Sequence, residues 1–369
     1  MPSLRLLNLT KRFGAIKALD NITFEVKNRE YICVLGSTGS GKTTLLRTIA
    51  GILRPDEGEV YMDDKKSNNV AAEDRNAVYV PQTYALFPHM TVLENVTFGP
   101  LAKEIDKATA EETAIKVLKL VRLDKRADAY PNELSGGMQQ RVALARGLAS
   151  GAKLLLLDEP LGALDVRLRL ELRTELRKLA KRSGLTVIHV THDQEEAMSI
   201  GDRILVLRKG QLQQYSTPYH VYNRPEKLFV ANFVGNTTFL EAIIKSRSKE
   251  GSALRLREGL KVRVLDSSYE PEEAVIIGVR EENVSITSEP RGDKPNRLSG
   301  EVTEIHFLGS FIRYVVKLTN SDEIAARVPI KGANTEIRQG DWVSISFNPI
   351  NTHVYEYPTL GLQHDLEAS

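Results

Sequence analysis

The chain has 369 residues, of which 41% are hydrophobic and 27% charged, so it is long enough for two domains with separate cores. Its 50 basic and 48 acidic residues leave a formal net charge of +2, which excludes a bulk electrostatic attraction to nucleic acid. The single cysteine, Cys33, cannot build a disulfide framework. Its position inside the apolar run YICVLG predicts a small buried core residue in a reducing compartment.

The sequence predicts neither a signal peptide nor a membrane-spanning helix. The N-terminal segment MPSLRLLNLTKRFG carries charges within its only apolar stretch and lacks a small-residue cleavage signal, so we do not expect a signal peptide. The longest uninterrupted apolar run, Leu154 to Leu157, is far shorter than the ~20 residues that span a bilayer. We therefore expect any membrane function to be exercised through a partner chain.

The first 235 residues alternate short apolar runs with amphipathic helical patterns, which indicates a parallel sheet covered by helices. Leucines recur at helical spacing between Arg167 and Ser183, and Gly184 ends that helix, which we interpret as scaffold. Residues 84–150 contain no convincing strand, and we expect a helical subdomain there, inserted between the strands of the sheet. The expected strands are 31–36, 77–82, 153–158 and 185–193.

Beyond residue 235 the hydrophobic period changes to two. Runs at 274–279, 302–308, 310–318 and 342–347 are separated by Gly, Asn and Pro turns, which is typical of antiparallel strands. We therefore predict one domain over residues 1–235 and a small barrel-like β domain over residues 236–369.

A phosphate-binding loop follows the first apolar run. Gly36, Gly41, Lys42 and Thr43 satisfy the pattern G-x-x-x-x-G-K-[ST] between a strand and a helical pattern. The glycines let backbone N–H groups surround phosphate oxygens, and the helix N-terminus adds partial positive charge. Lys42 is expected to reach the β- and γ-phosphates, and the Thr43 hydroxyl to ligate Mg²⁺.

The stretch LLLLDEP places two carboxylates directly after a buried strand. Asp158 is expected to hold magnesium through water, and Glu159 to orient or deprotonate the attacking water. No N-K-x-D element for reading guanine is present, so ATP is favoured over GTP.

A second glycine motif, LSGGMQQR at Leu134 to Arg141, also opens a helical pattern. Taken alone, this motif is either a second phosphate-binding loop or a helix N-terminus whose N–H groups are satisfied by a local turn. One ATP site does not need two such loops.

Six elements in order resemble the nucleotide-binding subunits of ATP-binding cassette (ABC) transporters. They are the loop Gly36 to Thr44, Gln82 in VPQTYALF, LSGGMQQR, LLLLDEP, Asp165 in LGALD and His192 in VTHDQEEA. The resemblance runs from about Leu4 to Gly235, and the tail looks like the TOBE-type, OB-like barrel attached to ATPases of bacterial and archaeal importers. The fold class this implies is α/β: a RecA-like P-loop NTPase core with an inserted helical subdomain, followed by an all-β barrel.

The resemblance also implies roles for individual residues. Two subunits pack head to tail, so the second glycine motif of one faces the ATP held by Lys42 of the other. Gln82 contacts magnesium and the attacking water, His192 contacts the γ-phosphate, and Phe13 lies where the family stacks an aromatic ring on adenine. The implied nucleotide-binding residues are Phe13, Gly36, Ser37, Thr38, Gly39, Ser40, Gly41, Lys42, Thr43, Thr44, Ser135, Gly136, Gly137, Gln139 and, at the dimer seam, Asp165.

The resemblance therefore predicts a homodimeric, Mg²⁺-dependent ATPase on the cytoplasmic face of a prokaryotic membrane. It powers import through two separate permease subunits, indirectly serves an extracytoplasmic solute-binding protein, and binds no nucleic acid. The tail segment FLGSFIRY looks more like that of polyamine, iron or phosphonate importers than of sugar importers. The alternatives are a cassette ATPase acting on DNA or ribosomes, which typically carries a long coiled coil or a second cassette, and a binding module with an inactive site.

Overall fold

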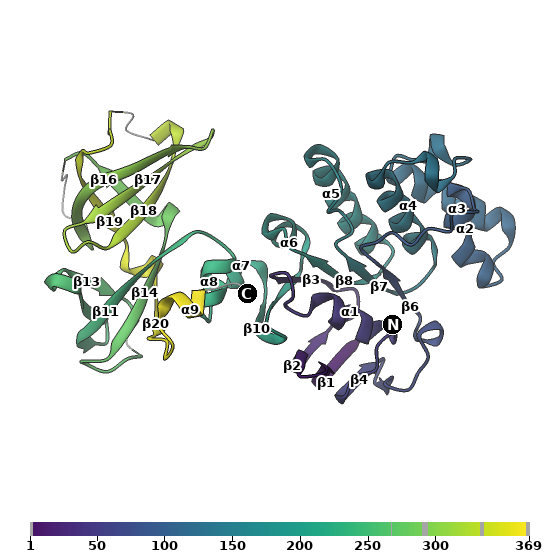
Figure 1. Ribbon diagram of the computed structural model, residues 1–369, viewed down its shortest axis with the longest axis horizontal. Helices are drawn as coiled ribbons and strands as arrows, with labels where there is room; N and C mark the ends of the chain where they lie inside the picture. The colour runs from purple at the N-terminus through teal and green to yellow at the C-terminus, as the bar shows by residue number, and fades with distance from the viewer. Residues whose placement is uncertain (1–2, 267, 290–293, 333–335, 367–369) are drawn as a thin grey trace. The chain divides into compact units, whose positions relative to one another are not determined.

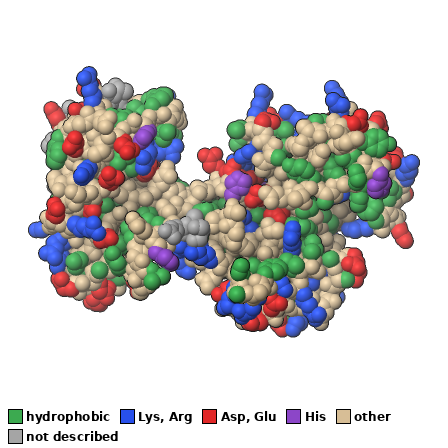
Figure 2. Space-filling model, viewed as in Figure 1, with side chains coloured by type: hydrophobic (Ala, Val, Ile, Leu, Met, Phe, Trp, Pro, Cys, Tyr) green, Lys and Arg blue, Asp and Glu red, His purple; other side chains and the backbone are tan. Residues whose placement is uncertain are grey.

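The computed structural model describes residues 3–266, 268–289, 294–332 and 336–366. The chain divides into two compact units, Met1–Val221 and Tyr222–Ala368. Among the described residues, no helix combines the length and apolar character needed to cross a bilayer. On the face seen in Figure 2, basic and acidic side chains are interspersed on each unit.

The first unit contains a six-stranded sheet with the strand order β10-β9-β3-β8-β7-β6. Strands β9, β3, β8, β7 and β6 are parallel, and β10 runs antiparallel to β9. The strands are β3 (Tyr31–Gly36), β6 (Ala77–Val80), β7 (Leu154–Asp158), β8 (Thr186–Thr191), β9 (Arg203–Arg208) and β10 (Gln211–Ser216). All four strands expected from the apolar runs are present, and the parallel α/β core is confirmed.

A second, antiparallel sheet in this unit was not expected. Its order is β2-β1-β4-β5, with β1 (Leu4–Phe13), β2 (Ile16–Val26), β4 (Glu57–Met62) and β5 (Lys65–Lys66). Leu4 and Leu6 of this sheet share one core with Leu45 and Ile49 of helix α1 (Lys42–Ala50) and with strands of the larger sheet. Helix α1, which follows the phosphate loop, is therefore packed into the core that both sheets share.

The helical subdomain lies at one end of the unit, where Figure 1 shows α2, α3 and α4 together. Its helices are α2 (Val92–Ala102), α3 (Lys107–Leu120) and α4 (Gly136–Ala149). The expected helix after Asp165 is α5 (Val166–Arg182), and α6 (Gln194–Ile200) follows β8. Cys33 is fully buried in β3, and burial raises the pKa of its thiol, as expected of a core residue.

The second unit is built from two five-stranded antiparallel sheets with the orders β13-β12-β11-β14-β20 and β15-β19-β16-β17-β18. The two sheets enclose one core that includes Leu240, Ile277, Val302, Tyr314 and Phe347, which confirms the barrel-like β domain. The strands are β11 (Thr237–Ser248), β12 (Gly251–Leu256), β13 (Lys261–Val264), β14 (Ala274–Arg280), β15 (Val284–Thr287), β16 (Arg297–Phe307), β17 (Phe311–Leu318), β18 (Glu323–Pro329), β19 (Trp342–Phe347) and β20 (Thr352–Glu356).

The division between the units lies earlier than the expected boundary after Gly235. Helix α7 (Pro218–Asn223) spans the division, and α8 (Leu228–Phe233) belongs to the second unit with α9 (Leu362–Leu366). Leu228 and Ala231 pack against Ile276 and Tyr355 of the β domain. The segment before Asn236 is thus part of the second unit, because its apolar side chains are buried against the β domain.

Candidate functional site

The phosphate loop joins β3 to the N-terminus of α1. Gly41 is the N-cap of α1 with φ of 104°, a conformation that favours glycine. A Cβ at Gly41 would lie 2.3 Å from the carbonyl oxygen of Ala18, so a side chain cannot be accommodated. The loop therefore brings backbone to the start of α1 without side-chain obstruction, which is the geometry that binds anions.

Lys42 is held against this loop. Its Nζ donates hydrogen bonds of 2.8 Å to the carbonyl oxygens of Gly36 and Ser37, and only 7% of the residue is exposed. Burial lowers the pKa of Lys42, while the neighbouring carboxylates Glu159 and Asp158 raise it. A partly desolvated cation on the first residue of a helix is well suited to bind phosphate.

Asp158 ends β7 and is almost completely buried. One oxygen, Oδ1, accepts a hydrogen bond from Thr43 Oγ1 at 3.2 Å, and the other, Oδ2, accepts one from Tyr79 Oη at 2.9 Å. Burial raises the pKa of Tyr79 to about 12, so the tyrosine stays a protonated donor at neutral pH. The structure thus joins two of the three predicted magnesium ligands, Thr43 and Asp158, and adds a partner for the carboxylate, whereas the third, Gln82, bonds to Glu159.

The donor set at this point fits Mg²⁺. A hydroxyl and a carboxylate are hard oxygen ligands, and Mg²⁺ is usually held by one or two carboxylates together with substrate phosphates and water. No cluster of three or more His, Cys, Asp or Glu side chains suited to a metal occurs among the residues that the structure describes. Thr43 and Asp158 are therefore the residues that would hold a magnesium ion here, together with oxygens of a bound nucleotide and water.

Glu159, Gln82 and His192 converge at the end of the sheet. Glu159 Oε2 accepts a hydrogen bond from Gln82 Nε2 at 3.0 Å and lies 3.4 Å from His192 Nδ1. Glu159 has φ of 50°, a conformation that is costly for a non-glycine residue and concentrates at functional sites. These three side chains share a cavity of about 460 Å³ with the phosphate loop; its lining is Ala18, Thr38, Gly39, Gly41, Lys42, Thr43, Thr44, Gln82, Glu159 and His192.

The second glycine motif lies outside this cavity. Ser135 is the N-cap of α4 and its side chain accepts a bond of 3.4 Å from Met138 N. Gln139 Nε2 donates to the carbonyl oxygen of Pro131 at 2.8 Å, so its amide supports the loop before the helix. None of Ser135, Gly136, Gly137, Gln139 or Asp165 lines the cavity that contains Lys42.

Asp165 and Phe13 are also placed away from the cavity within one chain. Asp165 is the N-cap of α5, where its Oδ1 accepts a hydrogen bond from Leu168 N at 3.0 Å. Phe13 is 49% exposed at the end of β1, with Lys11 Nζ 5.6 Å from its ring centroid. An exposed aromatic ring can stack on a base, and its predicted role stays a prediction.

Three residues that the sequence did not single out support the site. Tyr79 holds Asp158, as described above. Gln140 Nε2 donates to the carbonyl oxygen of Glu159 at 2.9 Å, while its Oε1 accepts from Ala163 N at 3.0 Å. Gln140 lies within the motif LSGGMQQR, and Tyr79 lies three residues before Gln82. Both residues are therefore adjacent to motifs that the sequence analysis recognised.

Arg169 is the third such residue and connects two loops. Its Nη2 donates to the carbonyl oxygen of Leu164 at 3.0 Å, and its Nη1 lies 3.5 Å from Asp193 Oδ2. Arg169 therefore links the loop before α5 to the residue that follows His192. Nothing in the local sequence distinguishes it from the other basic residues of α5.

Comparisons with known proteins identify the family. The ABC transporter family model matches residues 19–162, and the TOBE domain model matches residues 277–354. The chain is 38% identical to the spermidine/putrescine import ATP-binding protein PotA of Rubrobacter xylanophilus, covering 94% of this chain and 92% of that protein. It is 38% identical to PotA 2 of Pseudomonas aeruginosa, covering 89% and 91% respectively.

Solved structures agree with this assignment for the first unit. The dimeric ABC transporter cassette MJ0796 matches with a TM-score of 0.55 and 36% identity, covering 58% of this chain and 98% of the cassette. The same cassette in a dimeric post-hydrolysis state bound to ADP and phosphate matches equally well. The chain belongs to the ATP-hydrolysing, ATP-binding subunits of ABC transporters that carry a C-terminal TOBE domain.

Proposed function

We propose that this chain is the ATPase subunit of a polyamine importer. Its relatives over nearly the whole chain, tail included, are named spermidine/putrescine import ATP-binding proteins, and this observation carries the proposal. Polyamines are among the solutes that the FLGSFIRY tail favours. The subunit is expected to work on the cytoplasmic face of the membrane with two separate permease chains and, indirectly, an extracytoplasmic solute-binding protein.

The residues of the cavity divide the work of hydrolysis among them. Loop N–H groups and Lys42 bind the phosphates of ATP, and Thr43 and Asp158 would hold Mg²⁺, which supplies positive charge against the developing negative charge of the transferred phosphoryl group. Glu159 orients the attacking water and accepts its proton, and His192 donates a hydrogen bond to the γ-phosphate. Gln82 Nε2 donates a 3.0 Å hydrogen bond to Glu159 Oε2, the oxygen that also lies near His192, so Gln82 positions the carboxylate.

A dimer explains why the second glycine motif lies outside its own cavity. The N-terminus of α4, with Ser135 as its N-cap, is an anion-binding terminus that the cavity of the same chain does not use. We propose that Ser135, Gly136 and Gly137 contact the γ-phosphate bound to Lys42 of a second subunit. Because ATP then touches both subunits only in the closed dimer, ATP binding favours closure and hydrolysis releases it.

The permease contact is proposed on the helical subdomain. Phe98, Leu101 and Ile105 are exposed at 43%, 44% and 37%, an apolar group on and just after α2. The loop that joins this surface to Gln82 is braced by Arg146, whose guanidinium lies 5.1 Å from the Phe87 ring centroid. Movement of Gln82 on ATP binding would therefore reach the surface that faces the permease.

Uptake measurements test the assignment of cargo. A strain that lacks this gene is complemented with the wild-type gene or with Lys42→Ala, and uptake of radiolabelled spermidine, putrescine, ferric iron and a phosphonate is followed. Restored uptake of spermidine or putrescine by the wild type alone supports the proposal. Restored uptake of iron or phosphonate, with polyamine uptake unchanged, would assign a different cargo to the same ATPase.

A further inference from the structure

The backbone that carries His192 is held from inside the protein by buried side chains. Thr191 ends β8 and Asp193 is the N-cap of α6, so His192 is the single residue between strand and helix. The His192 side chain is 65% exposed, whereas Thr191 is only 3% exposed. The place of the exposed imidazole, 3.4 Å from Glu159 Oε2, is therefore set largely by its two buried neighbours along the chain.

Three hydrogen bonds form a ring that spans His192. Thr191 Oγ1 donates to Glu196 Oε2 at 2.6 Å, and Asp193 N donates to Thr191 Oγ1 at 3.0 Å. Glu196 N closes the ring by donating to Asp193 Oδ1 at 2.9 Å. The bond from the threonine hydroxyl to the carboxyl oxygen is at the short end of the normal range, as in strong hydrogen bonds. Glu196 thus fixes the residues on both sides of His192.

The second oxygen of Glu196 faces a buried histidine. His189 Nε2 lies 3.4 Å from Glu196 Oε1, and Tyr31 Oη lies 2.8 Å from His189 Nδ1. Burial raises the pKa of Tyr31, so its hydroxyl stays protonated and donates to Nδ1. Burial also lowers the pKa of His189, against the opposing effect of Glu196. A neutral ring that accepts at Nδ1 carries its proton on Nε2, the nitrogen that faces Glu196.

Stability does not explain a carboxyl group at this position. Glu196 is 3% exposed, and neither its Oε1 nor His189 Nε2 has a hydrogen-bond partner among the residues that the structure describes. Such buried polar atoms are costly, and an apolar side chain would be cheaper to bury.

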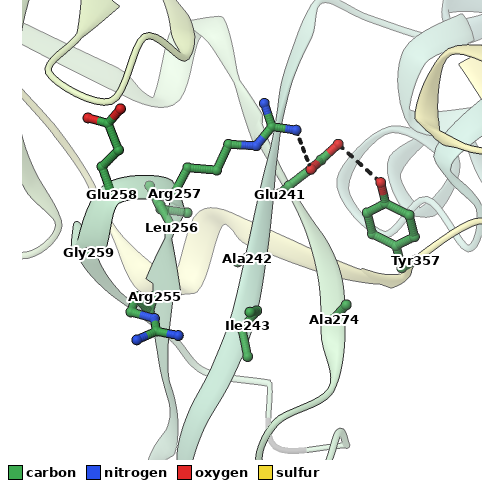
Figure 3. A pocket seen from close by; sticks show the side chains of 10 residues that line it. All are labelled: Glu241, Ala242, Ile243, Arg255, Leu256, Arg257, Glu258, Gly259, Ala274 and Tyr357. Carbon is green, nitrogen blue, oxygen red and sulfur yellow. Dashed lines mark hydrogen bonds and ion pairs between the residues drawn. The ribbon is translucent and has the colours of Figure 1, made fainter.

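Glu241 of the β domain shows the opposite case (Figure 3). The Arg257 guanidinium lies 2.5 Å from one of its oxygens, and the Tyr357 hydroxyl donates to the other at 3.2 Å. No lysine or arginine in the described part of the chain forms an ion pair with Glu196. The carboxyl group of Glu196 is therefore retained for the bonds that it makes to the chain around His192.

The same strand end also carries the backbone of the catalytic carboxylate. Glu159 N donates to the carbonyl oxygen of Val190 at 3.0 Å, one residue before Thr191. A shift of Thr191 would therefore change the spacing between the His192 imidazole and Glu159. Misplacement of a reacting group by about 1 Å can lower a rate by up to about 10²-fold.

We propose that Thr191 and Glu196 are positioning residues for His192 in ATP hydrolysis. The threonine hydroxyl links Asp193 N to the glutamate carboxyl group, and the closed ring holds the imidazole where the γ-phosphate binds. This inference rests on the proposed contact of His192 with the γ-phosphate. Neither residue touches ATP, so each acts through His192 alone.

Two substitutions of Thr191 separate its hydroxyl from its shape. Thr191→Val preserves the volume but removes the hydroxyl, and should lower kcat for MgATP about tenfold with KM within about twofold, because the phosphate loop is unchanged. Thr191→Ser restores the hydroxyl and should recover kcat to within about twofold of the wild type. A wild-type kcat in Thr191→Val, or an equal loss in Thr191→Ser, would overturn the proposal.

Thr97→Val is the matched control for loss of a buried hydroxyl. Thr97 is 4% exposed, and its hydroxyl donates to the carbonyl oxygen of Leu93 in its own helix, α2. Thr97→Val and Thr191→Val should lower the unfolding temperature to a similar extent, but only Thr191→Val should lower kcat. Equal losses of kcat in the two variants would assign the effect to stability and overturn the proposal.

Glu196→Gln tests the carboxyl group. It replaces one acceptor oxygen by an NH₂ group, which must face either the Thr191 hydroxyl or His189 Nε2. We expect kcat to fall at least about threefold with KM for ATP unchanged. A normal kcat would overturn the role assigned to Glu196.

A double-mutant cycle with His192→Ala tests whether the ring acts through His192. The rates are measured as single-turnover release of radiolabelled phosphate by the full chain. Thr191→Val should change the rate less than about twofold in the His192→Ala background, because the group that it positions is gone. A tenfold effect that persists in this background would overturn the inference alone. A wild-type rate in His192→Ala itself would instead refute the proposed role of His192, and with it this inference.

Discussion

Tyr79 Oη donates a 2.9 Å hydrogen bond to Asp158 Oδ2 from the strand next to that of the aspartate. The opposite carboxylate oxygen faces Thr43. One side of the carboxylate is thus anchored to the sheet, and the other is presented to the phosphate loop, where it can serve a nucleotide-bound magnesium.

Tyr79→Phe should weaken this arrangement without removing it. Loss of one bond to a nearly buried carboxylate costs about 1–3 kcal/mol, so we expect roughly tenfold slower ATP hydrolysis and a higher Mg²⁺ concentration for half-maximal rate. Tyr61→Phe is the matched control, since its hydroxyl bonds to Glu59 on β4. An unchanged Mg²⁺ dependence in Tyr79→Phe would show that the bond does not position Asp158.

Glu159→Gln should preserve ATP binding and lower turnover by about 10²–10⁴-fold, because an amide cannot accept the proton of the attacking water. The variant should accumulate as an ATP-bound dimer, detected by size-exclusion chromatography with light scattering. Glu175→Gln, which alters an exposed carboxylate paired with Lys178 on α5, is the control and should hydrolyse ATP normally. A monomeric Glu159→Gln protein with normal hydrolysis would remove Glu159 from its proposed role.

Arg169→Ala should lower kcat more than it raises KM for ATP. The guanidinium joins Leu164 of the loop before α5 to Asp193, which follows His192. Its loss should loosen both loops and leave the phosphate-binding loop unchanged. We expect about a tenfold loss in kcat and less than a twofold change in KM. Arg167→Ala is the control, because the Arg167 side chain is 90% exposed and forms an ion pair with Glu171 on its own helix. Equal kinetics in the two variants would contradict this role.

The sequence predicted the parts of the molecule whose chemistry is local. The phosphate loop, the carboxylates Asp158 and Glu159 at the end of β7 and the strand runs carry short-range patterns, and each lies where the sequence predicted it. The antiparallel sheet of β1, β2 and β4 was missed because bulges interrupt its alternation, with register shifts along β1. Arg169 and Tyr79 were missed because their partners, Asp193 and Asp158, are distant in sequence and only the fold brings them together.

Two truncations test where the cassette ends. A fragment of residues 1–221 should be monodisperse and bind ATP, since every residue of the cavity lies upstream. A fragment of residues 1–235 should bind a hydrophobic dye more strongly, because Leu228 and Ala231 lose Ile276 and Tyr355. Dye binding that is equal in the two fragments would place residues 222–235 with the cassette and support the boundary after Gly235.

The role of the second glycine motif is tested by a mixed dimer. One subunit carries Lys42→Ala and the other carries Gly137→Asp, whose carboxylate would repel the γ-phosphate. A Cβ at Gly137 would lie 3.2 Å from the carbonyl oxygen of Ala163, so folding of this subunit is first checked by circular dichroism and by ADP binding. If each site is shared between subunits, one site carries both defects and the other is intact.

The readout is the amount of ATP trapped under non-hydrolysing conditions, because hydrolysis at two coupled sites can hide one good site. Shared sites predict one trapped nucleotide per mixed dimer and none in either mutant homodimer. If each subunit used its own glycine motif, both sites of the mixed dimer would be damaged and none would trap ATP. Mixed dimers that trap no ATP, while wild-type dimers trap it and both variants are folded, would therefore refute the proposal that Ser135 and Gly137 serve the partner subunit's nucleotide.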